Sequence, residues 1–120
     1  LTIGALLVSQ VVIAEETNPY TGTWHINTVS KKGSPREGTL IIKDKNGIWD
    51  INWINVKNSC AGLPSPIIIK EASADSLVFE INKSKALRGC GNKVATLKRV
   101  SETTLKGKLD DGRVIMLVKE

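Results

Sequence analysis

The chain has 120 residues, of which 41% are apolar and 24% charged, a composition that indicates one globular domain and excludes a disordered chain. Its 17 basic and 12 acidic residues leave a net charge of +5, which favours an anionic partner. With one histidine and two cysteines, the sequence offers no ligand set for a metal, and we expect neither a metal nor a cofactor.

Residues 1–14 form an uncharged, largely apolar run that ends in Val12-Ile13-Ala14, just before Glu15 and Glu16. The run is shorter than the ~20 apolar residues of a membrane-spanning helix, and its end resembles a signal-peptidase site. We therefore expect a signal-peptide remnant, an exported protein that is periplasmic or secreted, and a mature form without a transmembrane segment. The alternative is that this run forms a first strand or helix of the fold.

Beyond residue 20, short apolar or alternating segments recur between turn signals, a pattern typical of an all-β protein. Asn46-Gly47 and Asp111-Gly112 favour tight hairpins, because these residues tolerate positive φ. The pattern predicts an eight-stranded antiparallel meander barrel over residues 22–120, after a lead at 15–21; a two-sheet β-sandwich is the alternative. The predicted strands are residues 22–30, 38–43, 47–56, 66–71, 76–82, 94–100, 103–109 and 113–119.

In a meander barrel, successive connections alternate between the two ends. The short connections at 44–47, 72–75 and 101–103 then share one end, and the longer ones at 31–37, 57–65 and 83–93 share the other, together with the hairpin at 110–112. Two of the longer connections contain Cys60 and Cys90. Since export permits oxidation, we predict a Cys60–Cys90 disulfide, which would stabilise the domain by roughly 3–4 kcal/mol.

Gly22-Thr23-Trp24, at the first predicted strand, resembles the G-x-W signature of the calycin superfamily, which includes lipocalins and avidins. The resemblance implies a small β-barrel that is closed at one end by Trp24 and open at a loop-bearing end. It also implies a basic residue of a late strand packed on that tryptophan, for which Arg113 or Lys119 is the candidate. The ligands of those families are not carried over, because no counterpart of the biotin-holding side chains of avidins is evident.

Basic side chains of the longer connections should gather at the open end, where they bind a ligand or merely keep the loops soluble. On the strand at 47–56, alternation places two tryptophans on the same face as Ile51, either in the core or inside a hollow barrel. The candidate ligand-binding residues are Lys31, Lys32, Arg36, Lys57, Lys83, Lys85, Arg88, Lys93, Trp49 and Trp53.

We therefore expect a non-enzymatic binding protein that engages an anionic or amphipathic small ligand, or an envelope protein, at this basic end. The alternative is a protein inhibitor or immunity-type protein that acts on an envelope hydrolase. An enzyme is disfavoured because His25 is the single histidine and faces away from Trp24 and Ile26 on its strand, and no nucleophile, phosphate-loop or paired-carboxylate motif is present. Nucleic-acid binding is disfavoured by export.

Overall fold

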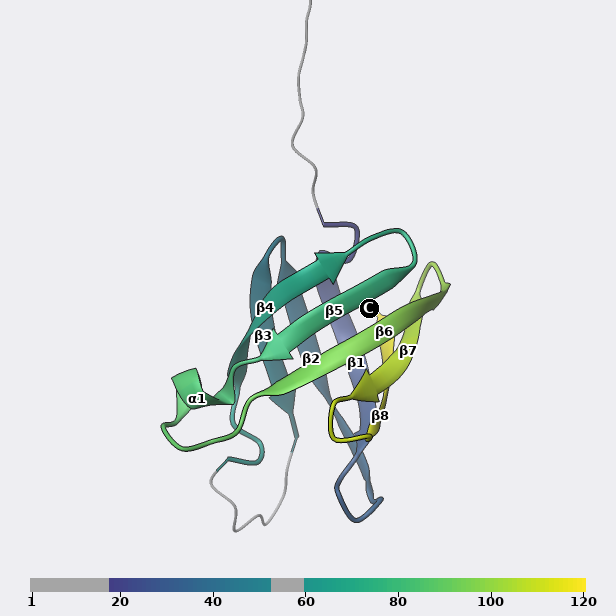
Figure 1. Cartoon of the computed structure of the whole chain (residues 1–120). Coiled ribbons are helices and arrows are strands. Elements are labelled where there is room, and N and C mark those ends of the chain that lie inside the picture. Colours follow the sequence, from purple (N-terminus) through teal and green to yellow (C-terminus); the bar gives the residue numbers. More distant parts are fainter. Residues whose placement is uncertain (1–17, 53–59) are drawn as a thin grey trace, which may run out of the picture.

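The computed structural model of the chain describes residues 18–52 and 60–120. The signal-peptide prediction, residues 15–17 of the predicted lead, Trp53 and Lys57 lie outside the described residues. In the described part, eight antiparallel strands form a closed barrel in which each strand pairs with the next and the last pairs with the first (Figure 1). The predicted all-β meander barrel is confirmed, and the β-sandwich alternative is wrong.

All eight predicted strands are present, with shifted ends. β2 begins at Pro35, three residues before the predicted start, because Pro35 to Glu37 pair with the end of β1. A four-residue helix, α1 (Lys83–Ala86), follows β5 where the sequence predicted a plain loop. The strands are β1 (Gly22–Val29), β2 (Pro35–Lys43), β3 (Asn46–Ile51), β4 (Ser65–Ala72), β5 (Ser76–Ile81), β6 (Lys93–Ser101), β7 (Thr104–Leu109) and β8 (Val114–Lys119).

The core follows from the two-residue period of the strands, which sends alternate side chains into the barrel. On β1, for example, Trp24, Ile26 and Thr28 are buried, while the intervening residues are partly exposed. The core continues through inward-facing side chains of all seven remaining strands, including Leu40, Trp49, Ile67, Phe79, Leu97, Leu105 and Leu117.

Tyr20 and Trp24 fill the barrel at the end that carries the short hairpins. Trp24 Nε1 donates to the Tyr20 carbonyl oxygen at 2.8 Å, and the Tyr20 hydroxyl donates to the Ser73 carbonyl oxygen at 2.6 Å. Both rings are fully or almost fully buried. Lys119 Nζ lies 5.5 Å from the centroid of the Trp24 ring, and Arg99 lies 5.4 Å from that of Tyr20.

Arg113 does not pack on Trp24, so this part of the predicted plug is wrong. β8 runs from the long-loop end to the short-hairpin end, which places its last residue, Lys119, opposite Trp24 in the register. Arg113 precedes β8 and therefore lies at the other end of the barrel. Of the two candidates that the sequence offered, the structure selects Lys119.

The connection between β1 and β2, the connection between β5 and β6 with its helix α1, and the hairpin between β7 and β8 lie at the lower end in Figure 1, opposite the short hairpins. The predicted Cys60–Cys90 disulfide is present, with a Cα–Cα distance of 5.6 Å, and it joins the connection after β3 to the connection before β6. In residues 18–52 and 60–120, no helix is long and apolar enough to cross a membrane.

Candidate functional site

A cavity of about 540 Å³ lies in the barrel where the longer connections meet. It is bounded by side chains of the strands and by the loops around its mouth. Its lining residues are Thr28, Ser30, Lys31, Lys32, Ser34, Arg36, Trp49, Ile51, Cys60, Ala61, Ile81, Lys83, Gly91, Lys93, Leu109 and Arg113.

The apolar part of this lining comes from strand residues that face the barrel interior. Trp49 and Ile51 are contributed by β3, Ile81 by β5 and Leu109 by β7, and all four are buried. The Trp49 ring packs on Phe79, with ring centroids 5.9 Å apart, so the wall continues into the filled core. The barrel is thus packed at one end and hollow at the other.

The charged part of the lining is cationic. Lys31 and Lys32 come from the connection between β1 and β2, Lys83 begins α1, Lys93 begins β6, and Arg113 comes just before β8; Arg36 on β2 completes the set. No carboxylate is among the described residues that line the cavity. The cavity therefore combines an apolar wall with a strongly positive one.

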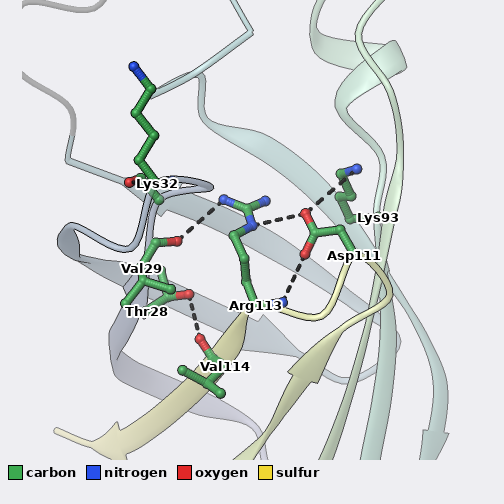
Figure 2. Close-up of polar contacts among 8 residues, drawn as sticks. Thr28, Val29, Lys32, Lys93, Asp111, Arg113 and Val114 are labelled. Atoms are coloured by element: carbon green, nitrogen blue, oxygen red, sulfur yellow. Dashed lines mark hydrogen bonds and ion pairs between the residues drawn. The ribbon is translucent and has the colours of Figure 1, made fainter.

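Asp111 lies next to this cationic wall and fixes the position of Arg113 (Figure 2). Arg113 Nε donates to Asp111 Oδ2 at 2.9 Å, and the Arg113 backbone N–H donates to Oδ1 at 3.1 Å. Lys93 Nζ lies 3.7 Å from the same Oδ2. On its other side, Arg113 Nη1 donates to the Val29 carbonyl oxygen at 3.5 Å.

The proximity of these charges shifts two pKa values. Burial lowers the pKa of Lys83, and the positive charges of Arg113 and Lys93 lower it further. Burial by itself would raise the pKa of Asp111, but the hydrogen bonds and charge of Arg113, together with the charge of Lys93, outweigh that effect and hold it below its ordinary value. Asp111 is therefore ionised at neutral pH.

Six of the ten predicted ligand-binding residues line this cavity: Lys31, Lys32, Arg36, Lys83, Lys93 and Trp49. Lys85 and Arg88 are not among its lining residues; both are exposed, in and just after α1, on the segment that projects from the barrel in Figure 1. Lys57 and Trp53 lie outside the described residues.

Sequence reasoning assigned Arg113 to the barrel plug instead of the cavity, and it did not include Asp111 among the candidate site residues. The signal that could have found Arg113 was the alternation of the connections, which already placed residues 110–112 at the open end. Asp111 was interpreted as a turn residue, and it does occupy a tight turn with Gly112 at φ 94°. Its carboxylate also contacts Arg113 and Lys93, which the turn residues alone do not indicate.

His25 is remote from this chemistry. Its Nε2 lies 2.9 Å from Glu37 Oε1 in a partly exposed pair. Within residues 18–52 and 60–120, no group of three or more His, Cys, Asp or Glu side chains is arranged to hold a metal ion.

No protein-family model and no curated protein matches the chain. Among solved structures, a designed fluorescence-activating β-barrel has 17% identity and a TM-score of 0.53, covering 90% of this chain and 100% of its own. A redesigned β-barrel has 12% identity and a TM-score of 0.52, covering 89% of this chain and 99% of its own. At such low identity these similarities establish the fold, which is a small closed eight-stranded β-barrel.

Proposed function

We propose that this chain is a non-enzymatic binding protein that takes a small anionic amphipathic ligand into the open end of its barrel. The observation that carries the proposal is one cavity with two kinds of wall. Trp49, Ile51, Ile81 and Leu109 supply an apolar surface, and the basic residues supply positive charge beside it.

The size and lining of the cavity suit such a ligand. Small-molecule sites usually occupy ~300–1,000 Å³ and combine mainly apolar walls with a few polar groups, and this cavity of about 540 Å³ lies within that range. Burial of a ligand's apolar body provides affinity, at about 25 cal/mol for each Å² removed from water. The cationic mouth attracts a negative head group and orients it toward the loops.

Two further features support this proposal. An eight-stranded barrel is just wide enough to hold one small ligand, and one of the similar designed barrels is described as fluorescence-activating.

We also infer that the protein is exported and calycin-like. The Cys60–Cys90 disulfide is compatible with an oxidising compartment, and Lys119 on Trp24 matches the basic residue that the G-x-W resemblance implies.

The proposal predicts that an anionic fluorescent fatty acid, such as 11-(dansylamino)undecanoic acid, binds with a blue-shifted, intensified emission. Its methyl ester, which has the same apolar body without the charge, should bind about tenfold more weakly, because charge-assisted hydrogen bonds at the mouth are lost. Fluorescence titration at low salt measures both affinities.

Matched variants locate the site. The double variant Lys31→Gln/Lys32→Gln removes two charges from the mouth and should weaken binding of the acid several-fold, roughly as expected for exposed cations. The control Lys43→Gln/Lys45→Gln removes two exposed charges from the hairpin between β2 and β3, at the opposite end, and should leave the affinity unchanged. Equal binding of acid and ester, or no binding of either, would contradict the proposal.

A further inference from the structure

The inner part of the cationic wall has more positive charge than the described residues around it balance. We define the inner cation cluster as Lys83, Lys93 and Arg113, which all line the cavity. Lys93 and Arg113 share one carboxylate, Asp111, and no other ion pair involves the cluster within the described residues. Three cations and one carboxylate leave two positive charges without a counter-charge.

The pKa of Lys83 agrees with this excess of positive charge. Its pKa is lowered by burial and by the charges of Arg113 and Lys93, so the three cations are close enough to repel one another. Lys83 Nζ donates to the Cys60 carbonyl oxygen at 3.4 Å, a neutral partner that offsets none of the charge.

Nearby acids do not supply the missing charge. The Glu37 carboxylate contacts His25 instead, and Asp110 is exposed beside the turn. Residues 53–59, which precede Cys60, contain no acidic residue in their sequence. Lys31 and Lys32 also line the cavity and add positive charge to it, and Lys32 extends away from Arg113 in Figure 2.

We propose that the ligand's head group is a dianion of the phosphate-monoester type, bound by Lys83, Lys93 and Arg113. This inference rests on the proposed function and narrows it from any anion to a doubly charged one. A phosphate monoester carries up to two negative charges near neutral pH and presents three acceptor oxygens, which matches a cluster of three donors with two uncompensated charges. A carboxylate or sulfate would leave one charge unbalanced.

The hydrogen bonds of Arg113 agree with this head group. Asp111 and Val29 engage the Nε and Nη1 groups, which hold the guanidinium plane in place across the mouth. The third nitrogen, Nη2, makes no hydrogen bond to a described residue. Its N–H groups can therefore donate to a ligand. A guanidinium held in this way is suited to phosphate oxygens, and the two lysines act as point charges beside it.

The test compares decyl phosphate with decyl sulfate, which share their chain and differ in charge, by isothermal titration calorimetry below micelle formation. At pH 7.5 we expect the phosphate to bind about tenfold more tightly. The second pKa of a phosphate monoester is about 6, so at pH 5 decyl phosphate carries mostly one negative charge. Its higher affinity relative to decyl sulfate should then disappear. Acidification can only add protons to Lys83, and Asp111 stays ionised because its pKa is depressed, so the loss would originate in the ligand.

Variants connect the effect to the cluster. Lys83→Gln and Lys93→Gln should each remove most of the preference for phosphate at pH 7.5. Lys98→Gln, an exposed position on the outer face of the same strand as Lys93, should preserve it. Thermal melts of all three variants verify that each is folded.

The outcomes separate the two proposals. Equal affinities for phosphate and sulfate at pH 7.5 would overturn the dianion inference and leave the amphipathic-ligand proposal intact. If neither probe binds, both fail. Inorganic phosphate, titrated in the same way, identifies the source: binding as tight as that of decyl phosphate would support a free phosphate, and much weaker binding would support a phosphorylated amphipath.

Discussion

Asp111 connects the turn between β7 and β8 to the cation cluster. Its two carboxylate oxygens accept from the Nε and the backbone N–H of Arg113, and Oδ2 also faces Lys93. Without this carboxylate, Arg113 and Lys93 would repel each other and the guanidinium would lose its anchor. A single acidic side chain thus contacts two of the three cations of the inner cation cluster.

The depressed pKa of Asp111 predicts how stability depends on pH. Since the folded pKa lies below the ordinary value of 3.8, the carboxylate stabilises the fold at pH values above 3.8, and this contribution is lost as the pH falls through the folded pKa. Asp111→Asn should therefore lower the free energy of unfolding at pH 7 by about 1–2 kcal/mol, as expected for partly exposed charge-assisted hydrogen bonds. At pH 2.5, below the ordinary pKa of 3.8, the difference between the variant and the parent protein should be smaller than at pH 7.

Urea unfolding at the two pH values measures this difference. Asp50→Asn is the control, because Asp50 is a partly exposed carboxylate on the outer face of β3, and it should show little change at either pH. A deficit for Asp111→Asn that is as large at pH 2.5 as at pH 7 would show that the amide disturbs packing and that the charge is not responsible.

The strands themselves were predictable because the forces that define them are local. Alternation identified the buried faces of β1 and β3, and Asp111-Gly112 marked the hairpin between β7 and β8. Asn46-Gly47 indicated a hairpin at the right place, but both residues belong to β3, and Asp44 takes the positive φ of 55°. The candidate site was predictable to the extent that it followed from topology, since counting the connections brought the basic loops and both cysteines to one end.

The rest depends on information that local patterns do not contain. α1 has only four residues and no buried side chain, so it has no helical periodicity to detect. Tyr20 precedes β1, and its burial results from contacts with Trp24 and the distant Ser73. To predict that Lys119 and not Arg113 packs on Trp24, one must know in which direction β8 runs along the barrel.

The close approach of β6 and β7 depends on Gly107, which alternation with the buried Leu105 and Leu109 places on the inward face of β7. A Cβ atom on Gly107 would overlap the Thr96 carbonyl oxygen and lie 2.6 Å from the Leu97 Cα, both in the backbone of β6. Because these atoms belong to a paired strand, they cannot move aside as a side chain would. β6 and β7 can therefore approach this closely only without a side chain at position 107.

Gly107→Ala should accordingly destabilise the protein by about 2–3 kcal/mol, the cost of forcing an extra methyl group into a packed structure. Gly91→Ala is the matched control, since a Cβ atom there meets nothing within 4 Å. Thermal unfolding followed by circular dichroism compares the two. Equal melting temperatures would show that β6 and β7 can separate without loss of closure.

Considered as a whole, the barrel has one packed end and one hollow end. The closed end is filled by Tyr20 and Trp24. The open end contains a cavity in place of packed side chains, and several cations line that cavity. Such an end is destabilised by its own repulsion, so it needs a constraint that does not depend on a core. The Cys60–Cys90 bridge provides this constraint, because Cys60 lines the cavity and both cysteines lie in connections at its mouth.

Removal of the bridge should therefore affect stability and binding together. In the chain-entropy model, a disulfide across a separation of 30 residues stabilises the fold by roughly 3–4 kcal/mol, and the double variant Cys60→Ser/Cys90→Ser should lose about that much. Its affinity for the amphipathic probe should also fall, since the connections that hold Cys60 and Lys83 are no longer tied together. Urea unfolding and probe titration measure the two effects, and the parent protein in reductant should behave like the variant. If the variant loses stability but, at a temperature where it is fully folded, binds the probe as tightly as the parent does, the bridge serves the fold alone and the mouth is shaped by the strands.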